Sequence, residues 1–148
     1  MLRNHTPKTG LEAKFSLEFA IASAVLRQGV GLNELNDEFV MRPEVQALFS
    51  KIFIDITDSK CDIEPAFAYS DRIVIQLNSN QILDSGEIRF AKGNSKNPLS
   101  LNELKAKFMD CFAVYKNNDQ SLDINSEQLF SKLSELNHVK SIQSLFLS

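Results

Sequence analysis

The segment from Ser16 to Gly31 limits most strongly what this chain can fold into. Apart from Glu18, its first part up to Leu26 consists of apolar residues and serines. Ser16 is suited to cap the start of a helix, and Gly29 and Gly31 are suited to end one. A helix that is apolar nearly all round and rich in alanine packs closely against its neighbours. We therefore expect a helix that is buried between two layers of structure.

Shorter elements are predicted on either side of this helix. Residues 1–14 are polar and contain a proline and a glycine, which favours a turn or the end of a strand. Residues 33–41 show a short helical pattern, and Pro43 suits the first turn of another helix over 43–51. The apolar face of that second helix is predicted to be Val45, Leu48 and Phe49.

Three strands are predicted in the middle of the chain. Residues 52–57 alternate isoleucine with other residues, which is typical of a strand, and residues 73–77 and 81–91 predict two more. The short polar turn at 78–80 predicts that the second and third strands form an antiparallel hairpin. Residues 84–86 interrupt the third strand and are typical of a bulge.

The last third of the chain is predicted to be helical. Ser100 and Glu103 have the spacing of a capping box at the start of a helix. The apolar face of this helix is predicted to be Leu101, Leu104, Phe108, Cys111, Phe112 and Tyr115. After a polar linker, Ser126 is expected to cap a helix that runs to Leu136, and a last short helix is expected over 138–146.

The order of helices, strands and helices predicts the α+β class. We expect a two-layer sandwich, in which a small, mostly antiparallel sheet of about three strands carries helices packed on one face. A chain of 148 residues fits a single domain over 1–148 and can bury a core without disulfide bonds or bound metal ions to stabilise it. Its core is expected over about 5–115, with C-terminal helices over 126–146.

Composition excludes several classes of partner. Charged residues make up 24% of the chain, its net charge is −3 and it has no basic block, so we expect no nucleic-acid partner. No segment approaches the roughly 20 apolar residues that span a bilayer. The N-terminus lacks the layout of a signal peptide because charged residues interrupt its apolar run. The cytoplasm is therefore the expected location.

Local motifs predict no catalytic, metal or phosphate site. The two histidines, His5 and His138, lie at opposite ends of the chain. Cys61 and Cys111 are 50 residues apart, without the spacing of zinc ligands, and two thiols suit a reducing compartment. The loop at 92–96 lacks the pattern of a phosphate-binding loop. Local motifs alone define no more than an α+β domain.

The fourteen-residue run over 7–20 indicates a protein family. Residues 7–20, PKTGLEAKFSLEFA, closely resemble the P-x-T-G-L-E-A-K-F-S-L-x-Y/F stretch that opens the C-terminal domain of MmgE/PrpD proteins. The similarity is collinear over roughly 5–115. Weaker matches follow at 22–32, 45–48, 93–101 and 107–111. A fourteen-residue run is far more specific than a short degenerate motif.

This resemblance implies chemistry on small di- or tricarboxylic acids. The family includes 2-methylcitrate dehydratase, cis-aconitate decarboxylase and iminodisuccinate epimerase, and none of them needs a metal or an organic cofactor. Abstraction of a proton beside a carboxylate requires a general base and cations for the developing charge. In the family most of these groups come from a large helical N-terminal domain. Because the resemblance begins close to Met1, we expect this chain to lack that domain and to be inactive alone.

Lys14 and Ser16 match the K-F-S of the family pattern. The functional interpretation is that both are substrate-binding residues, with Lys14 facing the cleft between the domains and helping to hold a substrate carboxylate. The structural alternatives are that Lys14 forms a surface or interdomain ion pair and that Ser16 only caps the helix. Expected partners are a helical N-terminal domain or a partner chain of the same family, a small carboxylic acid at the domain interface, and a second copy in a homodimer.

Two other functions remain open at this stage. The chain could be a free-standing carboxylate-binding or protein-interaction module that kept the fold and lost catalysis. It could also be an autonomous enzyme that uses His5, Lys14 and the cysteines, although no local constellation supports this reading.

Overall fold

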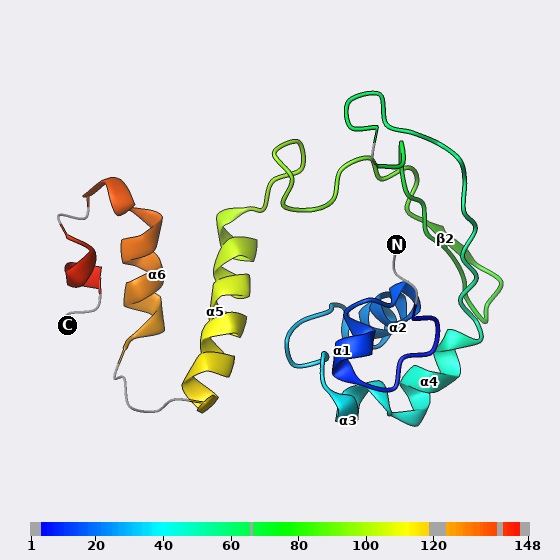
Figure 1. Ribbon diagram of the computed structural model, residues 1–148, viewed down its shortest axis with the longest axis horizontal. Coiled ribbons are helices and arrows are strands. Elements are labelled where there is room, and N and C mark those ends of the chain that lie inside the picture. Colours follow the sequence, from blue (N-terminus) through cyan, green and yellow to red (C-terminus); the bar gives the residue numbers. More distant parts are fainter. Residues whose placement is uncertain (1–3, 66, 119–123, 139–140, 146–148) are drawn as a thin grey trace. The chain divides into compact units, whose positions relative to one another are not determined.

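The computed structural model describes residues 4–65, 67–118, 124–138 and 141–145. They form helices and one two-stranded antiparallel sheet (Figure 1). The elements are α1 (Gly10–Ala13), α2 (Leu17–Arg27), α3 (Asp37–Val40), α4 (Pro43–Phe49), β1 (Val74–Gln76), β2 (Ile82–Asp84), α5 (Leu101–Asn118), α6 (Ser126–Ser134) and the 3-10 helices η1 (Leu136–His138) and η2 (Ile142–Leu145). The chain divides into two compact units, Met1–Phe53 with Leu104–Ser148, and Ile54–Glu103.

The main core of the first unit lies where α2 packs on α4. It consists of Ala13, Phe19, Ala22, Phe39, Val40, Val45 and Phe49. The ring of Phe19 meets that of Phe39 edge-on, with centroids 6.1 Å apart, an arrangement that adds to the burial of both rings. Pro43 occupies the first turn of α4, and the predicted apolar face of that helix points into this core. The helix predicted over 43–51 is therefore confirmed as α4, whereas the helical pattern predicted over 33–41 gives only the four-residue helix α3.

The prediction for residues 1–14 is wrong, because they contain one helical turn, α1. The Thr9 hydroxyl caps this turn by accepting from the N–H of Glu12 at 3.2 Å. The N–H of Gly10 donates to the carboxylate of Asp37 at 2.7 Å, which joins α1 to the start of α3. A helix of four residues is too short to show a helical period in the sequence.

Helix α2 begins where the sequence predicts and ends differently. The Ser16 hydroxyl accepts from the N–H of Phe19 at 3.1 Å, as expected of an N-cap. At the other end Gln28 adopts the left-handed conformation, with φ of 61°. Gln28 therefore takes the place that we predicted for a glycine. The N–H of Gln28 donates to the carbonyl of Ala24 at 2.9 Å. The last turn of α2 is therefore hydrogen-bonded without a glycine at this position.

The expectation that α2 is buried all round is only half met among the described residues. Phe19, Ala22 and Ser23 are buried. The exposed large apolar residues of the helix are Leu17 at its start and Val25 and Leu26 in its last turn. The middle of the alanine-rich helix therefore packs into the core, while apolar residues at both of its ends are open to solvent.

The second unit contains the predicted hairpin. Strands β1 and β2 pair antiparallel, with Val74 opposite Asp84 and Gln76 opposite Ile82. Asn80 in the connecting turn has a φ of 64°, a conformation that asparagine tolerates better than most residues. The strand predicted over 81–91 is shorter than expected, because regular pairing stops at Asp84.

A local interruption explains this early end of the strand. Gly86 has a φ of 64°, which breaks the extended backbone. Pairing returns beyond it as an isolated bridge between Asp71 and Ile88. Of the residues 84–86 that we expected to form a bulge, Asp84 is the last residue of β2, and Ser85 and Gly86 lie between the strand and this bridge.

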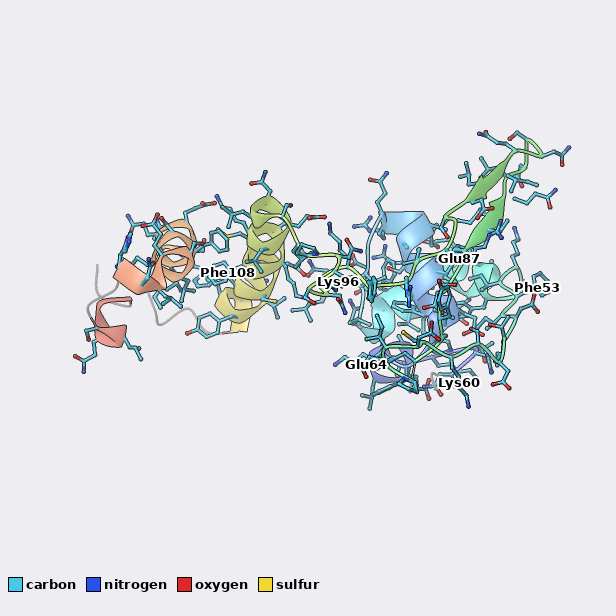
Figure 2. All side chains as sticks on the ribbon, turned by 90° about the horizontal axis from the view of Figure 1, so that it is seen from above. Phe53, Lys60, Glu64, Glu87, Lys96 and Phe108 are labelled. Atoms are coloured by element: carbon cyan, nitrogen blue, oxygen red, sulfur yellow. The ribbon has the colours of Figure 1, made fainter. Side chains whose placement is uncertain are left out.

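The strand predicted over 52–57 is absent, although all of its residues are described. Phe53 is 89% exposed and projects away from the ribbon in Figure 2. Alternating apolar residues become a strand only when another strand pairs with their backbone. The described fold is therefore mostly helical with one small antiparallel sheet, and the strand predicted over 52–57 is wrong.

Helices α5 and α6 meet through aromatic and charged contacts. The rings of Phe108 and Phe130 lie 5.4 Å apart, and Lys105 pairs with Glu127 at 2.5 Å. The predicted capping box is confirmed, because the N–H of Ser100 donates to the Glu103 carboxylate at 2.8 Å.

The start of α6 and the chain beyond it differ from the prediction. Asn125, rather than Ser126, caps α6, since its side chain accepts from the N–H of Gln128 at 3.1 Å. The last helix expected over 138–146 is replaced by η1 and η2, with 139, 140 and 146 outside the described residues. None of the helices in the described ranges is long and apolar enough to cross a membrane.

Candidate functional site

Lys14 lies at the C-cap of α1, directly before α2. Its backbone N–H donates to the carbonyl of Gly10 at 3.3 Å. Its side chain is exposed, and its ammonium forms no ion pair with any residue that the structure describes. An exposed ammonium without a partner is available to a carboxylate ligand.

Ser16 differs from Lys14 because its side chain is buried, with 2% of the residue exposed. Its hydroxyl oxygen accepts from the N–H of Phe19, and its proton is directed at the Glu18 carboxylate 3.4 Å away. The Ser16 hydroxyl therefore both accepts and donates a hydrogen bond within the protein. In this structure Ser16 fixes the start of α2 and helps to hold Glu18.

Glu18 is the residue that sequence reasoning missed. Its side chain is 8% exposed, and its Oε1 lies 2.5 Å from Nδ1 of His5, whose side chain is 72% exposed. Thirteen residues separate the two in the chain, so no spacing rule pairs them. A buried carboxylate is costly unless it is hydrogen-bonded or paired, and His5 and Ser16 supply these partners.

The segment that carries His5 is fixed by backbone contacts. The N–H of Asn4 donates to the carbonyl of Phe15 at 3.3 Å, and the Asn4 side-chain amide donates to the carbonyl of Glu12 at 3.0 Å. These bonds hold residues 4 and 5 against the junction of α1 and α2. We call His5, Lys14, Ser16 and Glu18 the junction cluster, and its members all come from this short stretch.

The second unit has a thiol of its own. Cys61 is buried, and the backbone N–H groups of Glu64 and Ile63, together with the Arg89 guanidinium, hold the pKa of its thiol below the ordinary value. Neither Cys61 nor Cys111 forms a disulfide.

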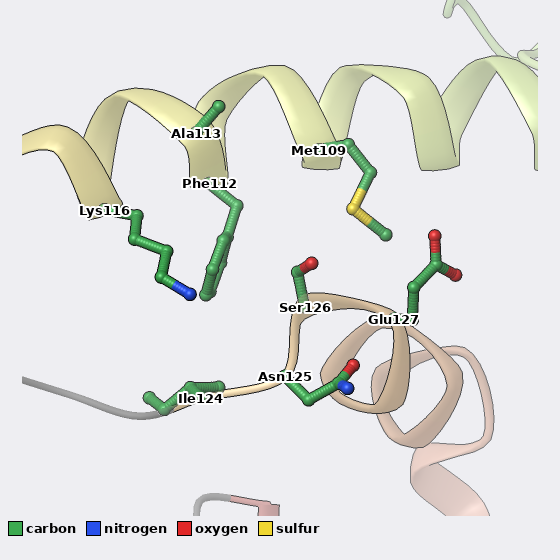
Figure 3. A pocket seen from close by; sticks show the side chains of 8 residues that line it. All are labelled: Met109, Phe112, Ala113, Lys116, Ile124, Asn125, Ser126 and Glu127. Carbon is green, nitrogen blue, oxygen red and sulfur yellow. The ribbon is translucent and has the colours of Figure 1, made fainter. Parts of the chain in front are cut away.

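A shallow pocket of about 410 Å³ lies between α5 and the start of α6 (Figure 3). It is lined by Met109, Phe112, Ala113, Lys116, Ile124, Asn125, Ser126 and Glu127. The Glu127 carboxylate already pairs with Lys105, and Asn125 caps α6. Within the described part of the chain, no three side chains are arranged to hold a metal ion.

The fold and the junction cluster together define a class of protein. It is a mostly helical domain with a small sheet, and the junction cluster, which includes the exposed side chains of His5 and Lys14, comes from the stretch where α1 meets α2.

Comparison with known families identifies the family to which this domain belongs. The model of the MmgE/PrpD C-terminal domain matches residues 1–132. The chain therefore belongs to the MmgE/PrpD family, as the run at 7–20 predicted. No curated protein sequence matches it significantly.

Proposed function

We propose that this chain is the C-terminal domain of an MmgE/PrpD lyase or isomerase that acts on small di- or tricarboxylic acids, with 2-methylcitrate dehydration as the model reaction. The family match over residues 1–132 carries this proposal. The chain works together with a helical N-terminal domain of the same family and is inactive without it. We place the protein in the cytoplasm, where both thiols stay reduced.

Lys14 is the substrate-binding residue in this proposal. Its exposed ammonium, which forms no ion pair among the described residues, can bind a carboxylate, and the turn of α1 holds its backbone at the edge of the core. Ser16 contributes two residues further on by fixing the start of α2. The Lys14 charge would also stabilise the negative charge that develops when a proton leaves the neighbouring carbon.

Uncovered apolar surface supports the proposed partner. Helix α2 exposes Leu17, Val25 and Leu26 in the first unit, and the hairpin exposes Val74, Ile82 and Leu83 in the second. Exposed large apolar side chains of this kind are available to a protein partner. In the assembled enzyme we expect the helical domain to cover some of them and the sheet to complete a two-layer sandwich.

An assay of the reconstituted pair tests this function. The chain is mixed with the separately produced helical domain of an MmgE/PrpD protein, and loss of 2-methylcitrate, cis-aconitate or iminodisuccinate is followed. Turnover by the pair that is absent from either component supports the proposal. Turnover that Lys14→Ala leaves unchanged, beside an unchanged Lys8→Ala control, would remove Lys14 from the substrate site.

The same apolar surface favours a second candidate function. A module without catalysis would use it to associate with copies of itself or with another protein, and would keep Lys14 for carboxylate binding. Sedimentation and calorimetry separate the two. Carboxylate binding and a stable homodimer, with no turnover in any reconstituted pair, would favour this module.

A further inference from the structure

We propose that His5 is the proton-transferring residue that this chain supplies to the reaction, and that Glu18 positions it. The inference rests on the proposed function and adds a general acid–base pair to it. Nothing in the local sequence joins the two residues, so the pair is a product of the fold.

The geometry fixes which nitrogen of His5 is available. An ionised carboxylate only accepts hydrogen bonds, so the 2.5 Å contact with Glu18 places the ring proton on Nδ1. The unprotonated nitrogen of the neutral ring is then Nε2. Because the His5 side chain is 72% exposed, it can reach a ligand. A carboxylate behind a histidine sets the tautomer in this way in many acid–base sites.

The surroundings of Glu18 favour a positioning role over a surface ion pair. Its side chain is 8% exposed and also receives the Ser16 hydroxyl at 3.4 Å. By contrast, His138 lies 3.9 Å from Glu135, and the side chains of both are about 70% exposed. The chain therefore contains one histidine on a buried carboxylate and a second on an exposed one, which serves as a control.

The proposed step is a proton transfer that needs no cofactor. The C–H bond beside a substrate carboxylate breaks, and its proton forms an N–H bond at His5 Nε2. The electron pair left on carbon is delocalised into that carboxylate, whose charge Lys14 balances. The proton later leaves Nε2 for the product carbon or for a departing hydroxyl, which then leaves as water.

The substitution His5→Asn separates catalysis from folding. The asparagine amide can replace Nδ1 as the donor to Glu18 but has no basic nitrogen that could accept a proton as Nε2 does. General acid–base catalysis contributes about 10²–10⁴-fold, so we expect kcat of the reconstituted pair to fall at least about 100-fold. The midpoint of thermal unfolding should stay unchanged, and His138→Asn should leave both quantities unchanged.

Nitrogen NMR of the intact chain tests the positioning by Glu18 without any activity. In its neutral form His5 should carry its proton on Nδ1, and Glu18→Gln should shift it toward Nε2. A neutral His5 ring that carries its proton on Nε2 in the wild-type chain would overturn the inference. Full activity of the His5→Asn chain, reconstituted with the helical domain, would also overturn it. Absence of turnover by the wild-type pair would overturn the proposed function itself, whatever the tautomer.

Discussion

The N–H of Gly10 donates to the Asp37 carboxylate at 2.7 Å, and the backbone at the start of α3 lies directly against the Cα of this glycine. A Cβ at position 10 would lie 2.5 Å from the carbonyl oxygen of Leu35 and 2.8 Å from Cα of Asn36. The contact involves backbone on both sides, so neither partner can rotate away. The glycine of the family run is therefore required by close packing.

Gly10→Ala should destabilise the first unit. Overpacking of this kind costs about 1–3 kcal/mol, and the loss should appear in the free energy of unfolding measured with urea. Gly29→Ala is the matched control, because a Cβ there has no neighbour within 4 Å. Equal stability of the Gly10→Ala and wild-type chains would contradict the packing argument.

Ser16→Ala should also destabilise the fold, for a different reason. The change removes the acceptor of the Phe19 N–H and one partner of the buried Glu18 carboxylate. Loss of an N-cap costs about 0.5–2 kcal/mol. Ser50→Ala, which alters an exposed hydroxyl, provides the comparison. If both serine variants have the same midpoint of urea unfolding as the wild-type chain, the Ser16 cap does not contribute to stability.

The start of α6 distinguishes two neighbouring residues. Asn125→Ala should weaken protection of the α6 amides from hydrogen exchange, because the side chain of Asn125 accepts from the N–H of Gln128. Ser126→Ala should have little effect, since Ser126 is already the first residue of the helix. The reverse order of effects would restore the cap that we first expected from the sequence.

The hairpin carries a carboxylate whose titration can be followed. The Arg72 guanidinium, helped by the N–H of Gly86, lowers the pKa of Asp84 from 3.8 to about 2. Because the pKa is lower in the folded state, this stabilisation is present above about pH 4 and is lost as the pH falls through about 2. Arg72→Gln should move the titration of the Asp84 carboxyl carbon back toward 3.8.

Glu103 is the internal control for this titration. Hydrogen bonds from Ser100, together with Lys92, lower its pKa to about 2, and none of these groups is changed in Arg72→Gln. Its midpoint should therefore stay in place. An Asp84 midpoint near 3.8 in the wild-type chain would show that the pair with Arg72 does not form in solution.

Local signals account for what the sequence predicted well. Pro43, Ser16 and the pair of Ser100 and Glu103 mark helix starts through contacts within one turn, and the hairpin turn has its own residue chemistry. The resemblance of 7–20 to the MmgE/PrpD family could likewise be recognised from the sequence, and the family match confirms it.

Features set by distant contacts were not predictable in this way. The pair of His5 and Glu18 joins residues thirteen apart, and α1 depends on the contact of Gly10 with Asp37, twenty-seven residues away. The false strand at 52–57 has the opposite cause. Its alternation is real, but pairing also needs a neighbouring strand, which the described residues do not provide.

Turnover of 2-methylcitrate by this chain, alone and together with the helical N-terminal domain of an MmgE/PrpD protein, is the decisive measurement. We predict no turnover by the chain alone and clear turnover by the pair, with loss of that turnover in Lys14→Ala. Clear turnover by the chain alone would contradict the assignment of this protein as a domain that depends on a helical partner.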